Sequence, residues 1–270
     1  MTSSIDHGAW ASRKSYFRLP DGRSLAYVDT GGTTAALIFI HGYSDSSRSF
    51  SLMEPFLRNY RLVIPDLPGH GVSDARDRWT VEGLASDIAA LIDSLDSVPV
   101  AVIGHSLGAM IAIRLASMDR PLMKTLVTIA GTVRPALSAD ASLCARILDL
   151  SDPIDPRDPF FEYWHACPQP VNQDFLDHLR GEAAAIPASV WHGIFFELCD
   201  LDLSFEAARI NIPSLGISGG QDELFDGKHR TALNNTVSDS QSIVMDGHGH
   251  NPHWENPELV AAHIRRFLAV

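Results

Sequence analysis

The stretch Gly104-His105-Ser106-Leu107-Gly108 indicates the fold of this 270-residue chain. It follows the continuous apolar run 99–103 and opens a helical pattern over residues 107–118. A serine between two glycines, where a buried strand turns into a helix, is typical of a nucleophile elbow. The glycines are needed because strand and helix approach each other closely at such a turn. The pattern is short enough to arise by chance, but in this context it predicts Ser106 as a nucleophile.

Other short apolar runs lie on both sides of this stretch. Most are continuous rather than alternating, as expected for strands of a parallel sheet that is covered on both faces. The continuous runs are residues 35–40, 61–65, 126–130, 214–217 and 242–245. An earlier pair, 16–19 and 24–28, is separated by Pro20-Asp21-Gly22-Arg23 and predicts a β-hairpin.

Helical patterns alternate with these runs. Apolar residues recur at spacings of three and four over residues 81–95, 107–118 and 258–268. Strands that alternate with helices predict βαβ units in an α/β fold with a doubly wound, mostly parallel sheet.

The alternation stops between residues 132 and 207, where no clear strand is present. This segment holds nine of the chain's aromatic residues, and it has 13 acidic residues against four basic ones. We interpret it as a helical lid over an active site, with residues 1–131 and 208–270 forming the core. Trp164 and Trp191 are the lid residues expected to bind substrate. The alternative is an extra helical layer whose charges are simply solvated.

Composition excludes several classes of protein. The formal net charge is -12 and no Lys/Arg-rich run is present, which argues against nucleic-acid binding. No apolar run is long enough to span a bilayer and no signal peptide is recognisable, so a cytoplasmic location without membrane contact is the default expectation. Cys144, Cys167 and Cys199 are too scattered for a disulfide framework or a metal site, and we expect them to be small buried hydrophobic residues.

A serine nucleophile needs a positioned base, and the base is expected late in the chain, after an acid. His250 fits, since it lies between the last predicted strand and the last predicted helix. His248 is the rival, but Gly249 allows the backbone to turn just before His250. A zinc site of His248, His250 and His253 is a third interpretation, although it lacks both an HExxH helix and a cysteine.

The acid should hold the imidazole in the correct tautomer. Asp222 directly follows the predicted strand 214–217 and is our candidate, with Glu223 one residue further on. Asp222 could instead be an ordinary turn or helix-cap aspartate.

Two backbone N–H groups are needed to stabilise an oxyanion. We expect one from Leu107, after the nucleophile, and one from Tyr43 in the loop that follows residue 40. Tyr43 and His105 are also expected to contact substrate. In the turn-rich segment Asp66-Leu67-Pro68-Gly69-His70-Gly71, Asp66 and His70 are interpreted as forming structural hydrogen bonds within loops.

These residues resemble the α/β-hydrolase superfamily. The motifs that carry the resemblance run in the family's order through both halves of the chain: His41-Gly42, the segment 66–71, Gly104 to Gly108, Asp222, Gly249-His250 and Glu255-Asn256-Pro257. The resemblance implies an eight-stranded, mostly parallel sheet with a helical cap after strand 6. It also implies a triad of Ser106, Asp222 and His250 with no cofactor and no metal.

The chemistry expected of such a triad is acyl transfer. We predict a hydrolase of carboxylic esters or lactones that acts through an acyl-enzyme. Neutral substrates are expected because the acidic lid disfavours anionic ones. The small-molecule substrate is the one partner expected. Hydrolysis of carbon–carbon bonds in diketones is an alternative, as is a non-catalytic member of the fold that binds a small ligand.

Overall fold

Eight strands form one mixed sheet in the computed structural model, which describes residues 8–32, 35–95, 99, 101–118, 121–137 and 142–269. The spatial order is β1-β2-β4-β3-β5-β6-β7-β8. The strands are β1 (Lys14–Arg18), β2 (Ser24–Asp29), β3 (Ala36–Ile40), β4 (Arg61–Pro65), β5 (Ala101–His105), β6 (Thr125–Ile129), β7 (Ser214–Gly219) and β8 (Ser240–Met245). Strands β1 and β2 form the predicted antiparallel hairpin and β2 is antiparallel to β4, whereas all other neighbours are parallel. The predicted eight-stranded, mostly parallel sheet is confirmed.

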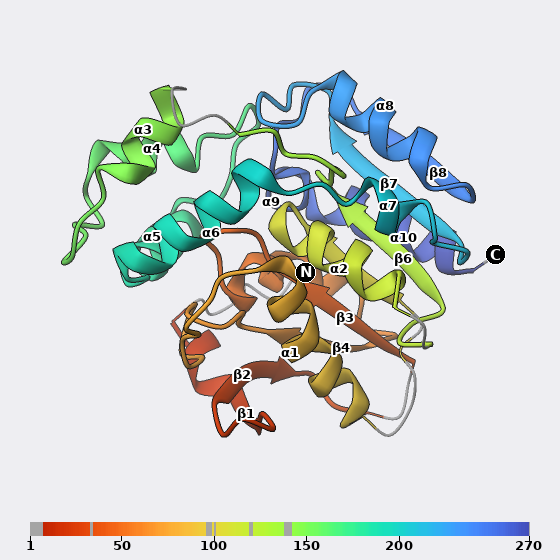
Figure 1. Cartoon of the computed structure of the whole chain (residues 1–270), viewed down its shortest axis with the longest axis horizontal. Coiled ribbons are helices and arrows are strands. Elements are labelled where there is room, and N and C mark those ends of the chain that lie inside the picture. The colour runs from red at the N-terminus through yellow and green to blue at the C-terminus, as the bar shows by residue number, and fades with distance from the viewer. Residues whose placement is uncertain are drawn as a thin grey trace.

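Helices cover both faces of this sheet (Figure 1). They are η1 (Trp10–Arg13), η2 (Ser47–Phe56), α1 (Val81–Asp93), α2 (Leu107–Ala116), α3 (Ser142–Leu148), α4 (Pro159–Trp164), α5 (Gln173–Ala184), α6 (Ala188–Asp200), α7 (Ser204–Ala207), α8 (Gly227–Thr236), α9 (Pro252–Glu255) and α10 (Pro257–Leu268). The helices predicted over 81–95, 107–118 and 258–268 correspond to α1, α2 and α10. No helix in the described ranges is both long enough and apolar enough to cross a bilayer.

The apolar runs are continuous because each strand contributes to two cores. In β3, Ile38 and Ile40 point into the core shared with α1 and α2, while Leu37 and Phe39 point into the core shared with η2 and α10. Strand residues that alternate between two apolar layers leave no polar face, which explains the sequence pattern.

The strand limits predicted from apolar runs differ from the observed ones by up to two residues at either end. The run 242–245 is the end of β8, which begins at Ser240, and most of the residues in this edge strand are exposed or half-buried. A strand with one neighbour can carry polar residues, so hydrophobicity alone underestimates its length. The run 99–103 is β5 from Ala101 onward, and Val100 lies outside the described residues.

Two of the helices that were not predicted, η2 and α8, are rich in polar residues. In α8 the one buried side chain is Leu233. The 3-10 helix η2 contains three serines and Pro55, and three of its six buried residues are serines, beside Phe50 and Met53 of the apolar core.

The three cysteines form no disulfide, and only one of them fits the expectation of burial. Cys144 is buried, but Cys167 and Cys199 are half-buried. The expectation was wrong for these two, since Cys167 lies in the loop between α4 and α5 and Cys199 lies in the last turn of α6, whereas Cys144 lies in α3.

A buried ion pair joins the first strand to the loop after β4. The Lys14 Nζ lies 2.6 Å from Asp66 Oδ2, and the two side chains are 3% and 0% exposed. Asp66 also accepts hydrogen bonds from the N–H groups of Ser47 (2.8 Å) and Val72 (3.1 Å). Burial by itself would raise the pKa of Asp66, but the charge and hydrogen bond of Lys14 outweigh it, so the pKa is lowered.

We predict that Asp66→Asn lowers the free energy of unfolding by about 3 kcal/mol at pH 7, because it leaves the buried Lys14 charge unpaired. A carboxylate with a lowered pKa in the folded state stabilises the protein above its unfolded pKa of about 4, and this contribution disappears as the pH falls further. The difference between wild type and variant should therefore shrink in acid, as measured by urea unfolding at several pH values. Asp239→Asn, at an exposed position, is the control and should change stability by less than about 0.5 kcal/mol. A difference that stays constant down to pH 2 would contradict the prediction.

Candidate active site

Ser106 lies in a strained turn between β5 and α2. Its backbone dihedrals are φ 51° and ψ -115°, in the region that favours glycine. A Cβ on Gly104 would lie 2.1 Å from the carbonyl oxygen of Gly108, and a Cβ on Gly108 would lie 2.0 Å from that of Ile40. Both glycines are therefore required by backbone contacts, as the elbow pattern predicted.

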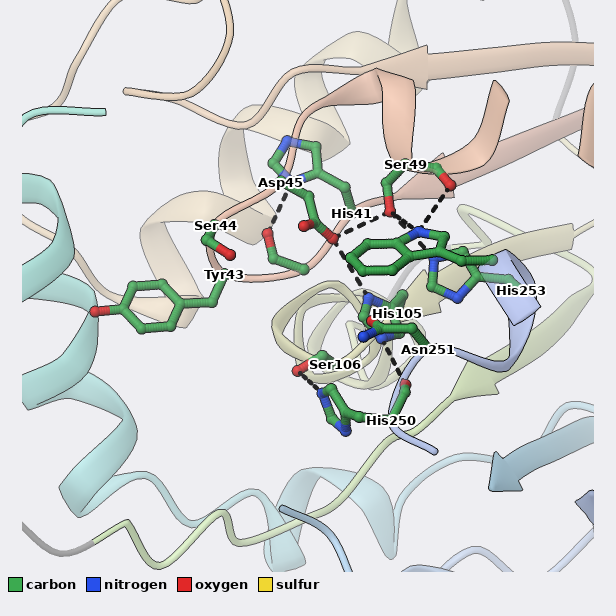
Figure 2. A network of polar contacts seen from close by, with 12 residues as sticks. His41, Tyr43, Ser44, Asp45, Ser49, His105, Ser106, His250, Asn251 and His253 are labelled. Carbon is green, nitrogen blue, oxygen red and sulfur yellow. Dashed lines mark hydrogen bonds and ion pairs between the residues drawn. The ribbon is translucent and has the colours of Figure 1, made fainter. Parts of the chain in front are cut away.

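The imidazole of His250 lies between Ser106 and Asp222. His250 Nε2 is 3.0 Å from Ser106 Oγ (Figure 2), and His250 Nδ1 is 2.9 Å from Asp222 Oδ2. The three residues come from the ends of different strands, and the parallel sheet places those ends at one edge. In this arrangement, the ring can accept the serine proton while the carboxylate orients it.

The carboxylate of Asp222 is buried and hydrogen-bonded. Besides His250, it accepts hydrogen bonds from the N–H groups of Leu224 and Phe225, each at 2.9 Å. Burial would raise the pKa of Asp222, but His250 and the two N–H groups lower it below its ordinary value. The rival Glu223 is exposed and makes no contact with the imidazole in the described structure.

The other histidines of this loop point elsewhere. His248 Nδ1 lies 2.9 Å from the carbonyl oxygen of its own neighbour Asp246, and His253 Nε2 lies 3.1 Å from Ser49 Oγ. In the part of the chain that the structure describes, no group of three or more His, Cys, Asp or Glu side chains is arranged to hold a metal ion. The zinc arrangement of His248, His250 and His253 is therefore not formed.

The loop after β3 is buried and is held by two histidines. His41 Nδ1 donates to the carbonyl oxygen of Gly42 at 2.8 Å, and its Nε2 accepts from the N–H of Leu67 at 2.8 Å. Burial lowers the pKa of His41 to about 4, so the ring is neutral. Its one N–H, on Nδ1, donates, and the lone pair of Nε2 accepts. His70 Nε2 lies 2.6 Å from the carbonyl oxygen of Tyr43. The structural interpretation of Asp66 and His70 is confirmed.

The backbone N–H groups of Tyr43 and Leu107 are the candidates for stabilising an oxyanion. Leu107 is the first residue of α2, so its N–H has no partner within the helix. Tyr43 N–H donates no hydrogen bond to any of the described residues. The dipole of α2 adds positive potential at the same place.

The predicted substrate-binding side chains join the loop after β3 to the helices between β6 and β7. The Tyr43 hydroxyl donates to the carbonyl oxygen of Trp191, and the two rings are 5.1 Å apart. Trp164 Nε1 donates to Ser44 Oγ at 2.5 Å. The Tyr43 phenol points away from Ser106 (Figure 2), and Tyr43 and Trp191 are 6% and 0% exposed. Their side chains contribute packing here, and the half-buried Trp164 is the most accessible of the three.

A salt bridge adds to this contact between the loop and the helices. Arg48 and Ser46 both bind the carboxylate of Glu182 in α5, at 2.7 Å and 2.5 Å. The two ends of the segment that contains α3 to α6 lie side by side, because Leu203 N–H donates to the carbonyl oxygen of Val133 at 2.8 Å. The segment is thus an insertion whose two ends meet, while α7 packs against α2.

Several residues that contact His250 or its neighbours in the loop were not identified from the sequence. Phe225 packs its ring against the imidazole, with centroids 5.3 Å apart. Glu255 Oε1 accepts from Gly249 N–H at 2.8 Å, and Gln169 Nε2 donates to the carbonyl oxygen of Gly247 at 2.7 Å. Glu255 follows the histidine motif closely enough to have been a candidate, whereas nothing in the sequence marks Gln169.

Comparison with known proteins assigns the class to which this fold and site belong. The chain belongs to the alpha/beta hydrolase family, whose sequence profile matches residues 37–263. The family assignment confirms the resemblance noted from the motifs.

Individual proteins and solved structures are similar to this chain to different extents. A pimeloyl-[acyl-carrier protein] methyl ester esterase of Xanthomonas campestris is 28% identical over 272 residues, which cover 90% of this chain and 98% of that protein. The magnesium-chelatase 30 kDa subunit of Rhodobacter capsulatus is 43% identical, but over 99 residues that span 35% of this chain and about a third (34%) of the relative. The structure of an esterase from Exiguobacterium antarcticum has a TM-score of 0.84 at 17% identity and covers 95% of this chain and 99% of its own, a likeness of fold. The family assignment and the esterase of Xanthomonas campestris support a hydrolase.

Proposed function

We propose that this protein is a serine hydrolase that cleaves neutral carboxylic esters, lactones included, through an acyl-enzyme intermediate. The observation that carries the proposal is the His250 ring, whose nitrogens lie 3.0 Å from Ser106 Oγ and 2.9 Å from Asp222 Oδ2. A base within reach of a serine, itself oriented by a carboxylate, activates the hydroxyl for attack on a carbonyl. The methyl ester esterase of Xanthomonas campestris supports an ester as the substrate.

In the proposed acylation step, His250 Nε2 takes the proton of Ser106 as Oγ attacks the ester carbonyl. Asp222 holds the ring through Nδ1–H and stabilises the imidazolium. The N–H groups of Tyr43 and Leu107 stabilise the oxyanion, and one such donor contributes roughly 10²- to 10³-fold. His250 then gives its proton to the leaving alcohol, and the acyl group stays on Ser106.

Deacylation repeats these roles with water as the nucleophile. His250 takes a proton from water as the oxygen attacks the acyl carbon, and it returns the proton to Ser106 Oγ as the carboxylic acid leaves. General acid–base catalysis in each half contributes roughly 10²- to 10⁴-fold.

We assign the insertion between Val133 and Leu203 as the cap of this site. Segment 132–207, which includes it, carries 13 acidic and four basic residues, and this charge disfavours anionic substrates and helps to release a carboxylate product. The aromatic residues of the cap favour an apolar acyl or alcohol group. Neutral esters are therefore preferred to acyl-CoA thioesters, whose phosphates are anionic.

The test combines covalent labelling with a substrate panel. A fluorophosphonate should label wild-type protein at Ser106 and should not label Ser106→Ala. Wild type should hydrolyse neutral nitrophenyl esters with a kcat/KM at least about tenfold above that for acyl-CoA thioesters of equal chain length. Folded protein that is not labelled would overturn the proposal in favour of a ligand-binding role, and a clear preference for thioesters would overturn the substrate class.

A further inference from the structure

His105, the residue before Ser106, contacts the backbone of His250 (Figure 2). His105 Nε2 lies 3.0 Å from the carbonyl oxygen of His250, although 145 positions separate the two residues in the sequence. His105 is 2% exposed, so it is poorly placed to bind substrate. This hydrogen bond joins the segment of the nucleophile directly to the segment of the base.

The partner of Nε2 decides which nitrogen of His105 carries the proton. A carbonyl oxygen only accepts hydrogen bonds, so Nε2 must donate. Burial lowers the pKa of His105, so the ring is neutral at pH 7 and has a single N–H. Nδ1 is then unprotonated and lies 3.6 Å from Asp45 Oδ2, which is too long for a hydrogen bond.

A buried network keeps the His105 ring in place (Figure 2). The ring of His253 packs against it with centroids 4.3 Å apart. Ser49 Oγ donates to Asp45 at 3.0 Å and accepts from Trp254 Nε1 at 3.0 Å. Since the hydroxyl has one proton, His253 must donate to Ser49 through Nε2, at 3.1 Å. Each member of the network thus has a defined orientation, and the ring of His105 has little freedom to move.

The remaining hydrogen bonds to the backbone of the loop after β8 act on residues other than His250. Glu255 binds Gly249 N–H, Gln169 binds the carbonyl oxygen of Gly247, and the N–H of Gln221 binds the carbonyl oxygen of His248. Among the described residues, His105 makes the one side-chain hydrogen bond to the backbone of His250. The position of the catalytic imidazole therefore depends on His105 more directly than on any of these contacts.

We propose that His105 is a positioning residue, which fixes the backbone of His250 so that its imidazole stays within reach of Ser106. The inference rests on the proposed function, since it concerns the alignment of base and nucleophile. His105 does not touch substrate in this role, so its loss affects the turnover of bound substrate and leaves binding unchanged.

The test compares two substitutions that differ in their ability to donate. His105→Leu has no donor and should lower kcat on a nitrophenyl ester by roughly 10- to 100-fold, as expected for a small misplacement of the base. His105→Gln can present an amide N–H to the same carbonyl and should stay within about threefold of wild type. KM should change by less than about twofold in both variants. A His105→Leu variant with the kcat of wild type, or an equal loss in both variants, would overturn the proposal.

A measurement on the wild type covers the case in which neither variant folds. Long-range ¹H–¹⁵N correlation spectra report which ring nitrogen is protonated, and His105 should be the neutral tautomer with the proton on Nε2. A proton on Nδ1 alone would contradict the hydrogen bond and the proposal with it. Wild type without esterase activity or fluorophosphonate labelling contradicts the proposed function, whereas an active wild type with insensitive His105 variants contradicts the positioning role alone.

Discussion

Replacing His250 with alanine is expected to lower kcat for ester hydrolysis by roughly 10⁴- to 10⁶-fold. The variant loses the group that lies 3.0 Å from Ser106 Oγ, and no other histidine ring is within hydrogen-bond distance of that atom among the described residues. Serine without a base is a poor nucleophile at neutral pH, so acylation and deacylation both stop. Steady-state kinetics on a nitrophenyl ester would measure the effect, and circular dichroism would show that the variant is folded.

His248→Ala is the matched control, because it removes the neighbouring histidine of the same loop. His248 Nδ1 lies near the carbonyl oxygen of Asp246 and away from Ser106, so kcat should stay within about threefold of wild type. If His248→Ala were the inactive variant and His250→Ala kept most of its activity, the assignment of the base would be wrong.

Replacing Gly108 with alanine is expected to lower the free energy of unfolding by more than about 4 kcal/mol, or to prevent folding. The added methyl group would lie 2.0 Å from the carbonyl oxygen of Ile40 and 2.6 Å from that of His41. Both atoms belong to the backbone at the end of β3, so no flexible side chain can move aside. The elbow would have to separate from the central strand of the sheet. Urea unfolding monitored by tryptophan fluorescence would measure the loss.

Gly181→Ala tests whether the effect comes from the contact and not from the residue type. Gly181 lies inside α5, is exposed, and has no atom within 4 Å of an added Cβ. Alanine in the middle of a helix stabilises it by roughly 0.5–1 kcal/mol over glycine. A Gly108→Ala variant that is as stable as Gly181→Ala would show that the tight strand–helix contact is not present in solution.

Much of the site was predictable because its signals are local. Ser106 follows a strand and precedes a helix, and the two glycines mark the close approach of those elements. Asp222 and His250 each follow an apolar run, and strands of a parallel sheet end at a common edge. Adjacent alternatives such as Glu223 and His248 occupy nearly the same place along the chain, so the direction of each side chain had to come from the structure.

Other features left little trace in the sequence. The helix η2 and the edge strand β8 are rich in polar residues, and their burial or pairing depends on neighbours that are distant along the chain. The sequence showed that the insertion is rich in aromatic residues, but it did not show what their side chains contact. Tyr43 and Trp191 bind each other and join the insertion to the loop after β3, whereas substrate contact was the expectation.

The order of apolar runs and the identity of the residues that follow them determined the sheet, the elbow and the three side chains of the proposed triad, because backbone hydrogen bonding and burial act on local patterns. Only the tertiary structure decided that His105 contacts the carbonyl of His250 and that Glu182 binds Arg48. Such contacts join residues more than a hundred positions apart. Their geometry depends on how all the helices and strands pack together. A short stretch of sequence does not contain that information.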